Sequence, residues 1–593
     1  MKFRDVALVF DAIEKESSRT KITIMLADVL RKATPTEASI IAYLSLGSLQ
    51  PPYLATQFNF AEKSMLKVVA NLLDKSVETV RAAAHRHGDL GMVVEEGSWR
   101  GSSEILSVHD VYKTLHQFLV ITGTGSQDIK EEKFIKFLKV LDPLSTKYVV
   151  RVVLGALRLG FSDMTLLDAF SWMETGDKSI RSDLEDAYNV CADIGLIIKT
   201  FKETGLDGIK QMGIEPGIPI RPAAAERMQD AKAIYHKLGP CIAQPKLDGF
   251  RLQVHVDKRD ATPKIYFFSR NLIDMSEMFP DLRKAVLDLN VKDLVAEGEA
   301  IAYDEETDAF LPFQETVKRK RKHGVEQAAQ EFPLKLFFFD ILYLNNKSLL
   351  DKSHEARRAM LDDILDTKII KAHDTIYPIS EVKLHEAKAL EDYFELNISN
   401  GLEGIIVKRP DAHYQPGKRN FNWIKLKRQE SGSLDDTIDC VILGYYLGHG
   451  KRASFGIGAL LVGVFNPKLD RFETVAKIGT GLTDQEWKDQ KKACDKLKVA
   501  ACPHNVICAK GLYPDVWVVP EIVCMIRADE ITRSPMHTAG ATQDRLGLAL
   551  RFPRLMGYRP DKSARDATTI KELERLFELQ FNKKEKKEKA GTK

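Results

Sequence analysis

Apolar and polar positions follow a helical period in the first third of this chain. Up to about residue 212, apolar residues recur at helical spacing, for example over 64–87 and 145–159, and strand-like alternation is scarce. Residues 213–222 are then too rich in proline and glycine to continue a helix, which marks a linker. The pattern therefore predicts an all-helical domain over residues 1–212.

Strand-like runs take over after this linker. Over residues 213–428 they alternate with helical stretches such as 355–367, which predicts an α+β domain. The polar stretch 429–436 interrupts the periodicity a second time. Short strands punctuated by glycine then predict a small β-barrel domain over 429–580. These strands are expected at 441–447, 458–465 and 472–478.

One short run carries more chemistry than the rest of the chain. It is Gln-Pro-Lys-Leu-Asp-Gly-Phe-Arg, and it joins Lys246 to Asp248, Gly249 and Arg251. Strand-like alternation begins just after Gly249, so Lys246 is expected at the rim of a sheet, where its amine can meet a phosphate. Taken alone, this pattern is weak, because a surface Lys/Asp pair beside a turn explains it as well.

Charged residues recur at the ends or on one face of several later apolar runs. They are Arg270 after 267–269, Glu297 and Glu299 within 294–301, Glu403 and Lys408 around 404–407, and Lys425 and Lys427 within 423–427. Neighbouring carboxylates such as Glu297 and Glu299 repel unless a cation lies between them. Acids that can hold a divalent metal and lysines that can hold phosphates thus recur along successive predicted strands.

A further run, 336–342, is almost wholly apolar and precedes Glu403. Together and in this order, the runs resemble the six motifs of the covalent nucleotidyltransferase superfamily, and most closely the ATP-dependent DNA ligases of archaea and eukaryotes. The resemblance runs from Ile41 to about Phe577 and includes 47–53 near the start and 550–554 near the end. It implies a multidomain fold: an all-α DNA-binding domain, an α+β adenylation domain and a C-terminal OB-fold barrel. It also implies sealing of nicks in duplex DNA through lysyl-AMP and AMP-DNA, in replication, repair and recombination.

The resemblance assigns a role to each motif residue. Lys246 would attack the α-phosphate of ATP, and Asp248 would act near the 3′-hydroxyl. Phe339 would stack on adenine, and Glu299 and Glu403 would bind Mg²⁺ or the ribose, with Mn²⁺ as an alternative metal. The implied nucleotide-binding residues are Gln244, Lys246, Arg251, Arg270, Glu299, Phe339, Lys408, Lys425, Lys427, Arg551 and Arg554.

DNA contacts are expected from both flanking domains. Lys147, Arg151 and Arg158 fall at i, i+4 and i+11, which predicts three cations along one helical stripe that can follow phosphates. An ordinary solvated face is the alternative. Phe313 and Phe552 resemble the aromatic residues that press into the minor groove beside a nick. For Phe552 the alternative is a place in the barrel core.

Gln244 departs from the family, which usually has a glutamate two residues before the nucleophile to accept a hydrogen bond from the adenine amino group. A glutamine carbonyl can accept that bond, but its amide can also flip and donate. ATP is therefore expected to remain the preferred cofactor, with weak use of GTP.

Composition narrows the setting. At 593 residues, the chain can hold three or four domains, and a formal net charge of +3 means that any DNA-binding surface is local. Seven cysteines do not suggest a disulfide framework. We expect no zinc at Cys494, Cys502, His504 and Cys508, whose spacing matches no standard finger. Residues 581–593 are expected to be a charged, solvated tail.

Location and partners follow from the same features. No apolar run approaches about 18 residues and no secretory signal opens the chain, so membrane association is not expected. A helical domain that begins almost at residue 1, without a long basic extension, favours an archaeal over a nuclear origin. The expected location is cytoplasmic, prokaryotic and DNA-associated, or nuclear if the source is eukaryotic, and a monomer is expected. Recruitment by a sliding clamp stays open, because no complete clamp-binding box is present.

Two other function classes compete. An RNA ligase or a capping-type nucleotidyltransferase would share Lys246 and the acids, but neither is expected to carry the helical domain upstream. A non-catalytic nick-binding scaffold would have lost at least one motif, whereas Lys246, Glu299, Glu403 and Lys425 are all present.

Overall fold

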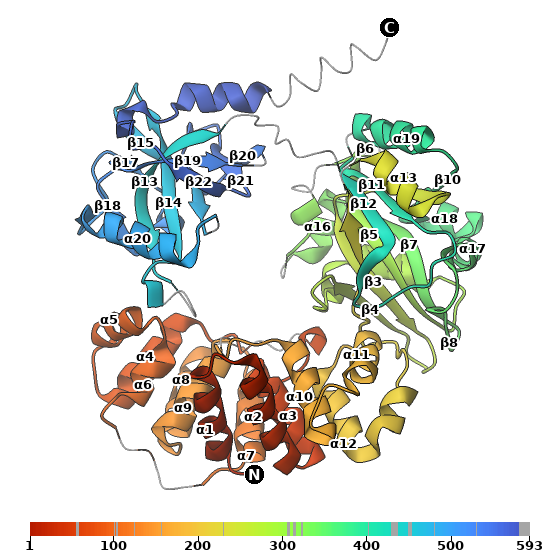
Figure 1. Ribbon diagram of the computed structural model, residues 1–593, viewed down its shortest axis with the longest axis horizontal. Coiled ribbons are helices and arrows are strands. Elements are labelled where there is room, and N and C mark those ends of the chain that lie inside the picture. The colour runs from red at the N-terminus through yellow and green to blue at the C-terminus, as the bar shows by residue number, and fades with distance from the viewer. Residues whose placement is uncertain are drawn as a thin grey trace. The chain divides into compact units, whose positions relative to one another are not determined.

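The computed structural model describes residues 1–579 except 55–57, 100, 102–104, 124, 156, 229, 305–308, 312–315, 322–323, 401, 428–436, 449–453, 480 and 529. Phe313 and the predicted tail at 581–593 lie outside the described residues. Contacts divide the chain into two compact units, Met1–Leu72 with Ser98–Arg428 and Leu73–Gly97 with Gln429–Lys593. Figure 1 shows the elements of each unit.

The prediction of a helical N-terminal region is confirmed. In the described part of the chain, every α-helix from α1 to α12 precedes the first strand, β1 (Ala224–Arg227). The helices are α1 (Phe3–Glu14), α2 (Arg19–Lys32), α3 (Pro35–Ser45), α4 (Glu62–Leu73), α5 (Val77–His87), α6 (Leu90–Glu95), α7 (Val108–Leu119), α8 (Ser126–Lys139), α9 (Pro143–Val153), α10 (Asp163–Thr175), α11 (Arg181–Val190) and α12 (Ile194–Gln211).

The predicted stripe of cations on α9 is wrong. The Asp142 side chain caps the helix by accepting from the Ser145 amide, and the helix ends at Val153, so Arg158 lies beyond it with a φ of 66°. Lys147 and Arg151 are only 2% exposed. A helical wheel assumes that a helix continues, and this one stops before the third cation.

Both buried cations on α9 pair with Glu14 of α1. Arg151 makes a two-pronged contact with the Glu14 carboxylate, at 2.8 Å on each side, and the Lys147 Nζ lies 3.1 Å from it. Tyr148 also donates to Glu14 at 3.0 Å. Buried charges require such partners. In this structure, Lys147 and Arg151 therefore join α9 to α1 instead of facing solvent.

Two sheets form the predicted α+β region. The first has the order β1-β12-β11-β2-β10, and the second has the order β4-β3-β5-β7-β8 with β6 on β5 and β9 on β7. The first contains β12 (Arg419–Lys427), β11 (Gly404–Lys408), β2 (Cys241–Lys246) and β10 (Val382–Leu384). The second contains β3 (Phe250–Asp257), β4 (Lys264–Ser269), β5 (Asp293–Asp304), β6 (Ala309–Phe310), β7 (Leu334–Leu344), β8 (Lys347–Ser348) and β9 (Ile376–Pro378).

Helices cover one face of each sheet. The five-stranded sheet packs Ala243, Ile405 and Ile424 against α13 (Ala231–Leu238) and α19 (Ala387–Ser399). The other sheet packs on α14 (Pro280–Leu287) and α17 (His354–Ile364), near α16 (Val325–Glu331) and α18 (Thr367–His373). Side chains alternate between faces along a strand, so Gln244 and Lys246 point away from the helical side of their sheet.

The C-terminal region is rich in strands, as predicted, but the closed barrel is not observed. Its main sheet follows the path β16-β18-β13-β14-β15-β17, with β19 and β22 added beside β13, and among the described residues this path does not return on itself. The elements of the C-terminal region are β13 (Ile438–Tyr446), β14 (Ala459–Asn466), β15 (Arg471–Ile478), α20 (Asp484–Asp495), β16 (Lys498–Val499), β17 (Val506–Ile507), β18 (Val516–Val518), β19 (Val523–Arg527), β20 (Glu530–Ser534), β21 (Gly547–Arg551) and β22 (Arg554–Tyr558). Of these, β20 and β21 pair in a separate two-stranded sheet.

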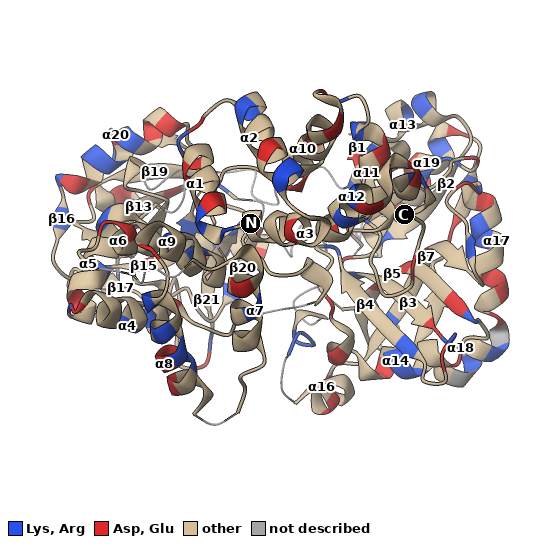
Figure 2. Cartoon of the chain, turned by 90° about the horizontal axis from the view of Figure 1, so that it is seen from below, with Lys and Arg blue, Asp and Glu red and all other residues tan. Residues whose placement is uncertain are grey.

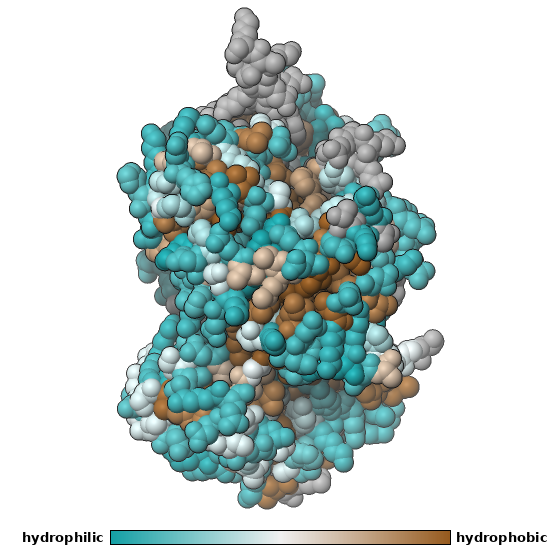
Figure 3. Space-filling model, turned by 90° about the vertical axis from the view of Figure 1, so that its right-hand side faces the viewer, coloured by the Kyte–Doolittle hydropathy of each residue, from teal (hydrophilic) through white to brown (hydrophobic). Residues whose placement is uncertain are grey.

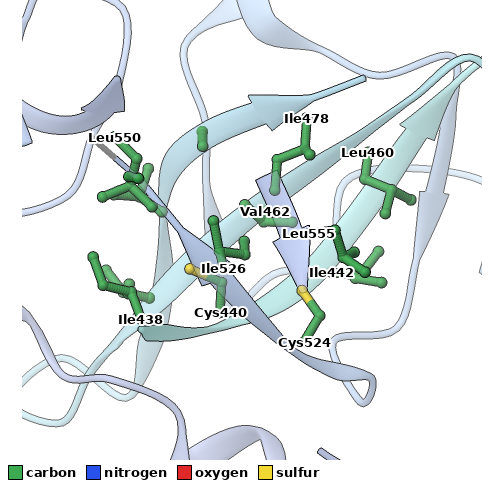
Figure 4. Close-up of a cluster of buried hydrophobic side chains, with 14 of the residues drawn as sticks. Ile438, Cys440, Ile442, Leu460, Val462, Ile478, Cys524, Ile526, Leu550 and Leu555 are labelled. Atoms are coloured by element: carbon green, nitrogen blue, oxygen red, sulfur yellow. The ribbon is translucent and has the colours of Figure 1, made fainter. Parts of the chain in front are cut away.

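Strands β13, β14 and β15 match the three predicted strands. Their inward-facing positions are almost wholly apolar, and this pattern made them predictable. Their side chains meet those of β19 and β22 in one buried cluster, in which Cys440, Val462 and Leu555 are among the residues drawn (Figure 4). Cys494 belongs to this cluster, whereas Cys502 and Cys508 pack against a different one. The three cysteines considered for zinc are thus divided between two apolar clusters, and His504 is exposed.

Candidate nucleotide-binding and adenylation site

Lys246 ends strand β2, and its side chain forms an ion pair with Glu403. Glu403 also pairs with Lys427 at the end of β12, so one carboxylate lies between two ammonium groups. Register explains the meeting, because Gly404 of β11 faces Lys246 on one side and Lys427 on the other. Burial acts to raise the pKa of Glu403, but the two lysines outweigh it and hold that pKa below its ordinary value.

Glycine is required beside this pair. The backbone at Gly404 has a φ of 149°, and a Cβ there would lie 2.1 Å from the carbonyl oxygen of Leu426. A Cβ at Gly249, just after Asp248, would lie 2.3 Å from the carbonyl oxygen of Ala300. These close approaches bring β11 against β12, and the turn after Lys246 against β5.

Glu299 approaches the same place from β5. Its Oε1 accepts a hydrogen bond from the Gly249 amide at 3.1 Å. Burial raises the pKa of this carboxyl to about 7, although Lys246 and Arg251 act to lower it, and Asp248 raises it further. The structure therefore gathers Glu299, Asp248 and Lys246 around one turn.

Cations converge beside Lys246. Burial lowers the pKa of Lys425, and the neighbouring charges of Lys427, Arg419, Arg270 and Lys246 lower it further. Like charges repel unless anions lie among them. A cluster of this kind suits a polyphosphate, and it unites four of the residues expected from the sequence.

Phe339 and Lys408 lie deeper between the two sheets. The Lys408 Nζ donates to the Phe339 carbonyl at 2.9 Å and lies 4.3 Å from the centre of the Trp423 ring. Phe339 meets Trp423 edge to face, with ring centres 6.0 Å apart. Burial lowers the pKa of Lys408 to about 8, while Asp340 acts in the opposite direction. Phe339 is partly exposed, as a ring that stacks on a base must be.

The Arg251 guanidinium forms hydrogen bonds with other groups of the protein. Its Nη2 lies 2.9 Å from both carboxylate oxygens of Glu297, and its Nη1 donates to the Ala223 carbonyl. Tyr414 donates to the same carboxylate at 2.8 Å. The repulsion expected between the two glutamates of β5 is thus relieved at Glu297 by Arg251.

Sequence reasoning missed the support beneath this site. Arg357 of α17 binds Asp340 with two contacts, at 2.7 and 3.0 Å, and all four participating atoms are buried. Burial acts to raise the pKa of Asp340, but Arg357 and Lys408 hold it far below its ordinary value. The available signal was Asp340 itself, an acid within the otherwise apolar run 336–342.

The C-terminal candidates lie in the other unit. Arg551 of β21 pairs with Glu530 at 2.8 Å, and Arg554 begins β22. Phe552 lies between these strands with a φ of 50° and is 58% exposed, so it is not a core residue.

The surface has no dominant sign of charge. Lys and Arg alternate with Asp and Glu on the helices in Figure 2, in line with a formal net charge of +3. On the face in Figure 3, hydrophilic residues predominate and apolar ones form smaller patches. Within the described residues, no helix combines the length and apolar character needed to cross a bilayer.

Three family models match the chain in order. They are the DNA ligase N terminus over residues 2–171, the ATP dependent DNA ligase domain over 222–427 and the ATP dependent DNA ligase C terminal region over 453–562. The second match contains every site residue described above from Ala223 to Lys427.

Relatives match over nearly the whole length. A "Probable DNA ligase" of Dictyoglomus turgidum is 43% identical over 590 residues, 99% of each chain. The "DNA ligase 1" of Methanosarcina acetivorans is 36% identical over 98% of this chain and 100% of its own. The solved structure named "Pmar-Lig_PreS3" covers 93% of this chain and 99% of its own with a TM-score of 0.55, and at 17% identity it supports a shared fold alone. The chain belongs to the ATP-dependent DNA ligase family.

Proposed function

We propose that the enzyme seals nicks in duplex DNA with Lys246 as the covalent carrier of AMP. The ion pairs that Glu403 makes with both Lys246 and Lys427 carry this proposal, because they hold Lys246, at the end of β2, beside the cations that we assign to the phosphates. The Lys246 amine attacks the α-phosphorus of ATP and loses a proton to solvent. A P–N bond forms, and pyrophosphate leaves with the electrons of the broken P–O bond.

Two transfers then complete the reaction. An oxygen of the nick 5′-phosphate attacks the phosphorus of lysyl-AMP, which breaks the P–N bond and releases Lys246. The 3′-hydroxyl attacks the activated 5′-phosphate, a phosphodiester forms, and AMP leaves. Such chemistry depends mainly on in-line placement and neutralised charge. We assign Asp248 to the 3′-hydroxyl end.

For the nucleotide, we propose that the base stacks on Phe339 beside Trp423. Lys408 and the cluster of Arg270, Lys425 and Lys427 neutralise the phosphates. Arg251 contacts the nucleotide or the nick phosphate, and its hydrogen bonds to Glu297 and the Ala223 carbonyl hold its guanidinium in place. Arg551 and Arg554 orient pyrophosphate in the first step, through a rotation of the C-terminal domain.

Glu299 and Glu403 are the residues we propose for Mg²⁺, with Mn²⁺ as an alternative. The described residues contain no group of three metal-ligating side chains, but Mg²⁺ commonly binds through one or two carboxylates, substrate phosphates and water. The carboxyl of Glu299 fits such a site, because burial has raised its pKa to about 7 and a nearby cation favours its charged form. Bound Mg²⁺ neutralises charge on the phosphates.

The flanking regions support DNA binding. We propose that the C-terminal region is an OB-fold whose Phe552 enters the minor groove beside the nick, as does Phe313. We propose that Arg158 contacts a DNA phosphate. Lys147 and Arg151 reach DNA only if their ion pairs with Glu14 open. We propose domain boundaries after residues 212, 428 and 580, with a charged tail beyond.

We propose a cytoplasmic, DNA-associated location, which the prokaryotic sources of the relatives support. We also propose that the enzyme is a monomer and that a sliding clamp recruits it, which pull-down with the purified clamp would test. A monomer is checked by light scattering at several protein concentrations.

An adduct assay with α-labelled ATP tests the proposal. Wild-type protein should carry label through denaturing electrophoresis, and Lys246→Arg should not. Wild type should then seal nicked DNA much faster than nicked RNA. A label that persists in Lys246→Arg would assign the adduct to another residue, and faster sealing of RNA would favour an RNA ligase. Failure to form any adduct would favour a nick-binding scaffold.

A further inference from the structure

Gln244 has a defined partner on the neighbouring strand. Its Nε2 donates a hydrogen bond to the Oε2 of Glu381 at 2.9 Å, and Gln244 is only 1% exposed. The pairing of β10 with β2 explains this contact. Val382 lies opposite Ala243, so the antiparallel register places Glu381 beside Gln244.

Two further groups, the imidazole of His354 and the guanidinium of Arg358, hold Glu381 as a carboxylate. His354 Nε2 lies 3.2 Å from the same Oε2, and Arg358 Nη1 lies 3.3 Å from it. Burial acts to raise the pKa of Glu381, but His354, Gln244 and Arg358 outweigh it and lower that pKa to about 2. At neutral pH this group therefore only accepts hydrogen bonds.

The charge on Glu381 fixes the orientation of the Gln244 amide. An amide nitrogen and oxygen are nearly identical in shape, so their placement rests on the hydrogen-bond network. Here the network leaves one choice, because turning the amide would set two acceptor oxygens against each other. The Gln244 carbonyl must then point away from Glu381, and among the described residues no donor bonds to it.

The Gln244 side chain lies on the same face of its sheet as the Lys246 side chain. Gln244 and Lys246 are two residues apart on β2, so their side chains share a face and are separated along the strand by roughly 7 Å. This face is the one opposite the apolar cluster of Ala243 and Ile405. A nucleotide with its α-phosphate at Lys246 can thus present its base edge to Gln244.

We propose that Glu381 is a specificity-determining residue that locks Gln244 as an acceptor, so that the site admits adenine and excludes guanine. This inference rests on the proposed attachment of the nucleotide to Lys246. The amino group of adenine can donate to the locked carbonyl. Guanine presents a carbonyl oxygen at the same position, and two acceptors would then face each other without a proton between them.

The contact revises the expectation of weak GTP use. That expectation required the Gln244 amide to turn freely, whereas Glu381 holds it in one orientation. A glutamine locked in this way offers the base the same acceptor as the usual glutamate of the family. Glu381 thus compensates for the presence of Gln244 where the family usually has a glutamate.

Glu381→Gln tests the lock, since a neutral amide can donate to or accept from Gln244 in either orientation. The measurement is the initial rate of covalent adduct formation with α-labelled ATP and with α-labelled GTP, for full-length protein. We expect wild type to prefer ATP by at least about 100-fold and Glu381→Gln to reduce that preference at least tenfold, or about 1.4 kcal/mol. Glu391→Gln, the same change on the exposed side of α19, should keep the wild-type preference.

A second variant keeps the test decisive if Glu381→Gln does not fold. The double exchange Gln244→Glu with Glu381→Gln reverses the hydrogen bond while preserving charge and volume, and it should restore the preference for ATP. The proposal is overturned if wild type uses GTP within tenfold of ATP, if folded Glu381→Gln keeps the wild-type preference, or if the folded double exchange does not prefer ATP. Absence of an adduct with every nucleotide in wild type would instead count against the proposed function.

Discussion

The Nζ atom of Lys408 donates a hydrogen bond to the backbone carbonyl of Phe339, with 2.9 Å between nitrogen and oxygen. The two residues belong to different sheets, Lys408 to β11 and Phe339 to β7. This bond therefore fixes the position of Phe339, on which we propose that adenine stacks, relative to a cation of the opposite sheet. A change in the charge of Lys408 affects both that cation and the position of Phe339.

The first prediction concerns the pH dependence of ATP binding. Burial lowers the pKa of Lys408 to about 8, so this group loses its charge above that pH. Calorimetry on Lys246→Arg, which cannot form the adduct, should show an ATP dissociation constant about 3–10-fold larger at pH 9 than at pH 7.5. Adding Lys408→Met should remove most of this dependence. An equal slope in both proteins would mean that another group titrates.

A rise in pH has the opposite effect on folding stability: loss of the Lys408 charge should weaken ATP binding but stabilise the folded state. Its pKa lies below the value of 10.5 in the unfolded chain, so between about pH 8 and 10.5 the unfolded state binds more protons. The contribution of Lys408 to the free energy of unfolding should therefore rise with pH across this window. Denaturant titrations of wild type and Lys408→Met at pH 7.5 and 9.5 would measure the difference.

The second prediction separates the chemical steps. Lys246→Ala should reduce adduct formation with ATP below ~0.1% of wild type. The reason is that none of the other motif lysines lies at the end of β2, where we propose that the attack on ATP occurs. Sealing of chemically pre-adenylated nicked DNA should stay measurable, within about 100-fold of wild type, because the lysine no longer carries AMP in that step. If the variant binds nicked DNA normally yet seals no pre-adenylated substrate, Lys246 has a further role in the third step.

The third prediction concerns Phe552. Its ring is 58% exposed and its backbone has a φ of 50°, which costs a non-glycine residue about 1 kcal/mol or more. Phe552→Ala should slow sealing about tenfold and weaken discrimination against mismatched 3′ ends, while adduct formation changes less than about twofold. Leu546→Ala, also exposed in this region at 52%, is the control and should leave both activities intact. Equal losses in the two activities of Phe552→Ala would argue against a role on DNA.

The fourth prediction tests the pairs between α1 and α9. Glu14→Gln removes the carboxylate that Arg151 contacts on both sides and leaves Lys147 paired with Asp11 at 3.4 Å, so it should lower the free energy of unfolding by about 3–5 kcal/mol. Asp28→Asn, which removes one member of an exposed pair with Arg31, should change it by less than about 0.5 kcal/mol. Comparable effects would show that the pairs with Glu14 contribute little.

Acid should act on the same pairs. Burial acts to raise the pKa of Glu14, but Arg151 and Lys147 outweigh it and bring that pKa to about 2, below the unfolded value of 4.5. The stabilisation is therefore complete above about pH 4.5 and is lost as the pH falls toward 2. Thermal melting of wild type should show this loss, and Glu14→Gln should show less of it.

The sequence was most informative where chemistry and local pattern coincide. Lys246 could be placed at a strand end because alternation starts just after Gly249, and β13, β14 and β15 could be located because their inward positions are apolar. Barrel closure could not be predicted in this way, because it depends on pairing between strands far apart in the chain. A local pattern contains no information about that pairing.

Two other features depended on distant partners. Arg151 meets Glu14 across 137 residues of sequence, so no helical wheel of α9 could reveal that its cations are buried. Glu381 reaches Gln244 through the pairing of β10 with β2, also 137 residues away, and no motif marks it. In both cases the tertiary contact reverses the prediction made from one side chain alone.

The sharing of Glu403 between Lys246 and Lys427 has a consequence for the sequence of events on DNA. Before reaction, the two ammonium groups and the carboxylate sum to one positive charge. In the proposed reaction, adenylation removes the charge of Lys246 and adds the negative charge of one phosphodiester-like group, so these three groups together become negative by one unit. The charge beside Lys427 thus falls by two units, while Arg270, Arg419 and Lys425 remain as cations for an incoming 5′-phosphate. Release of AMP to the DNA restores the original charge and resets the enzyme for its next ATP.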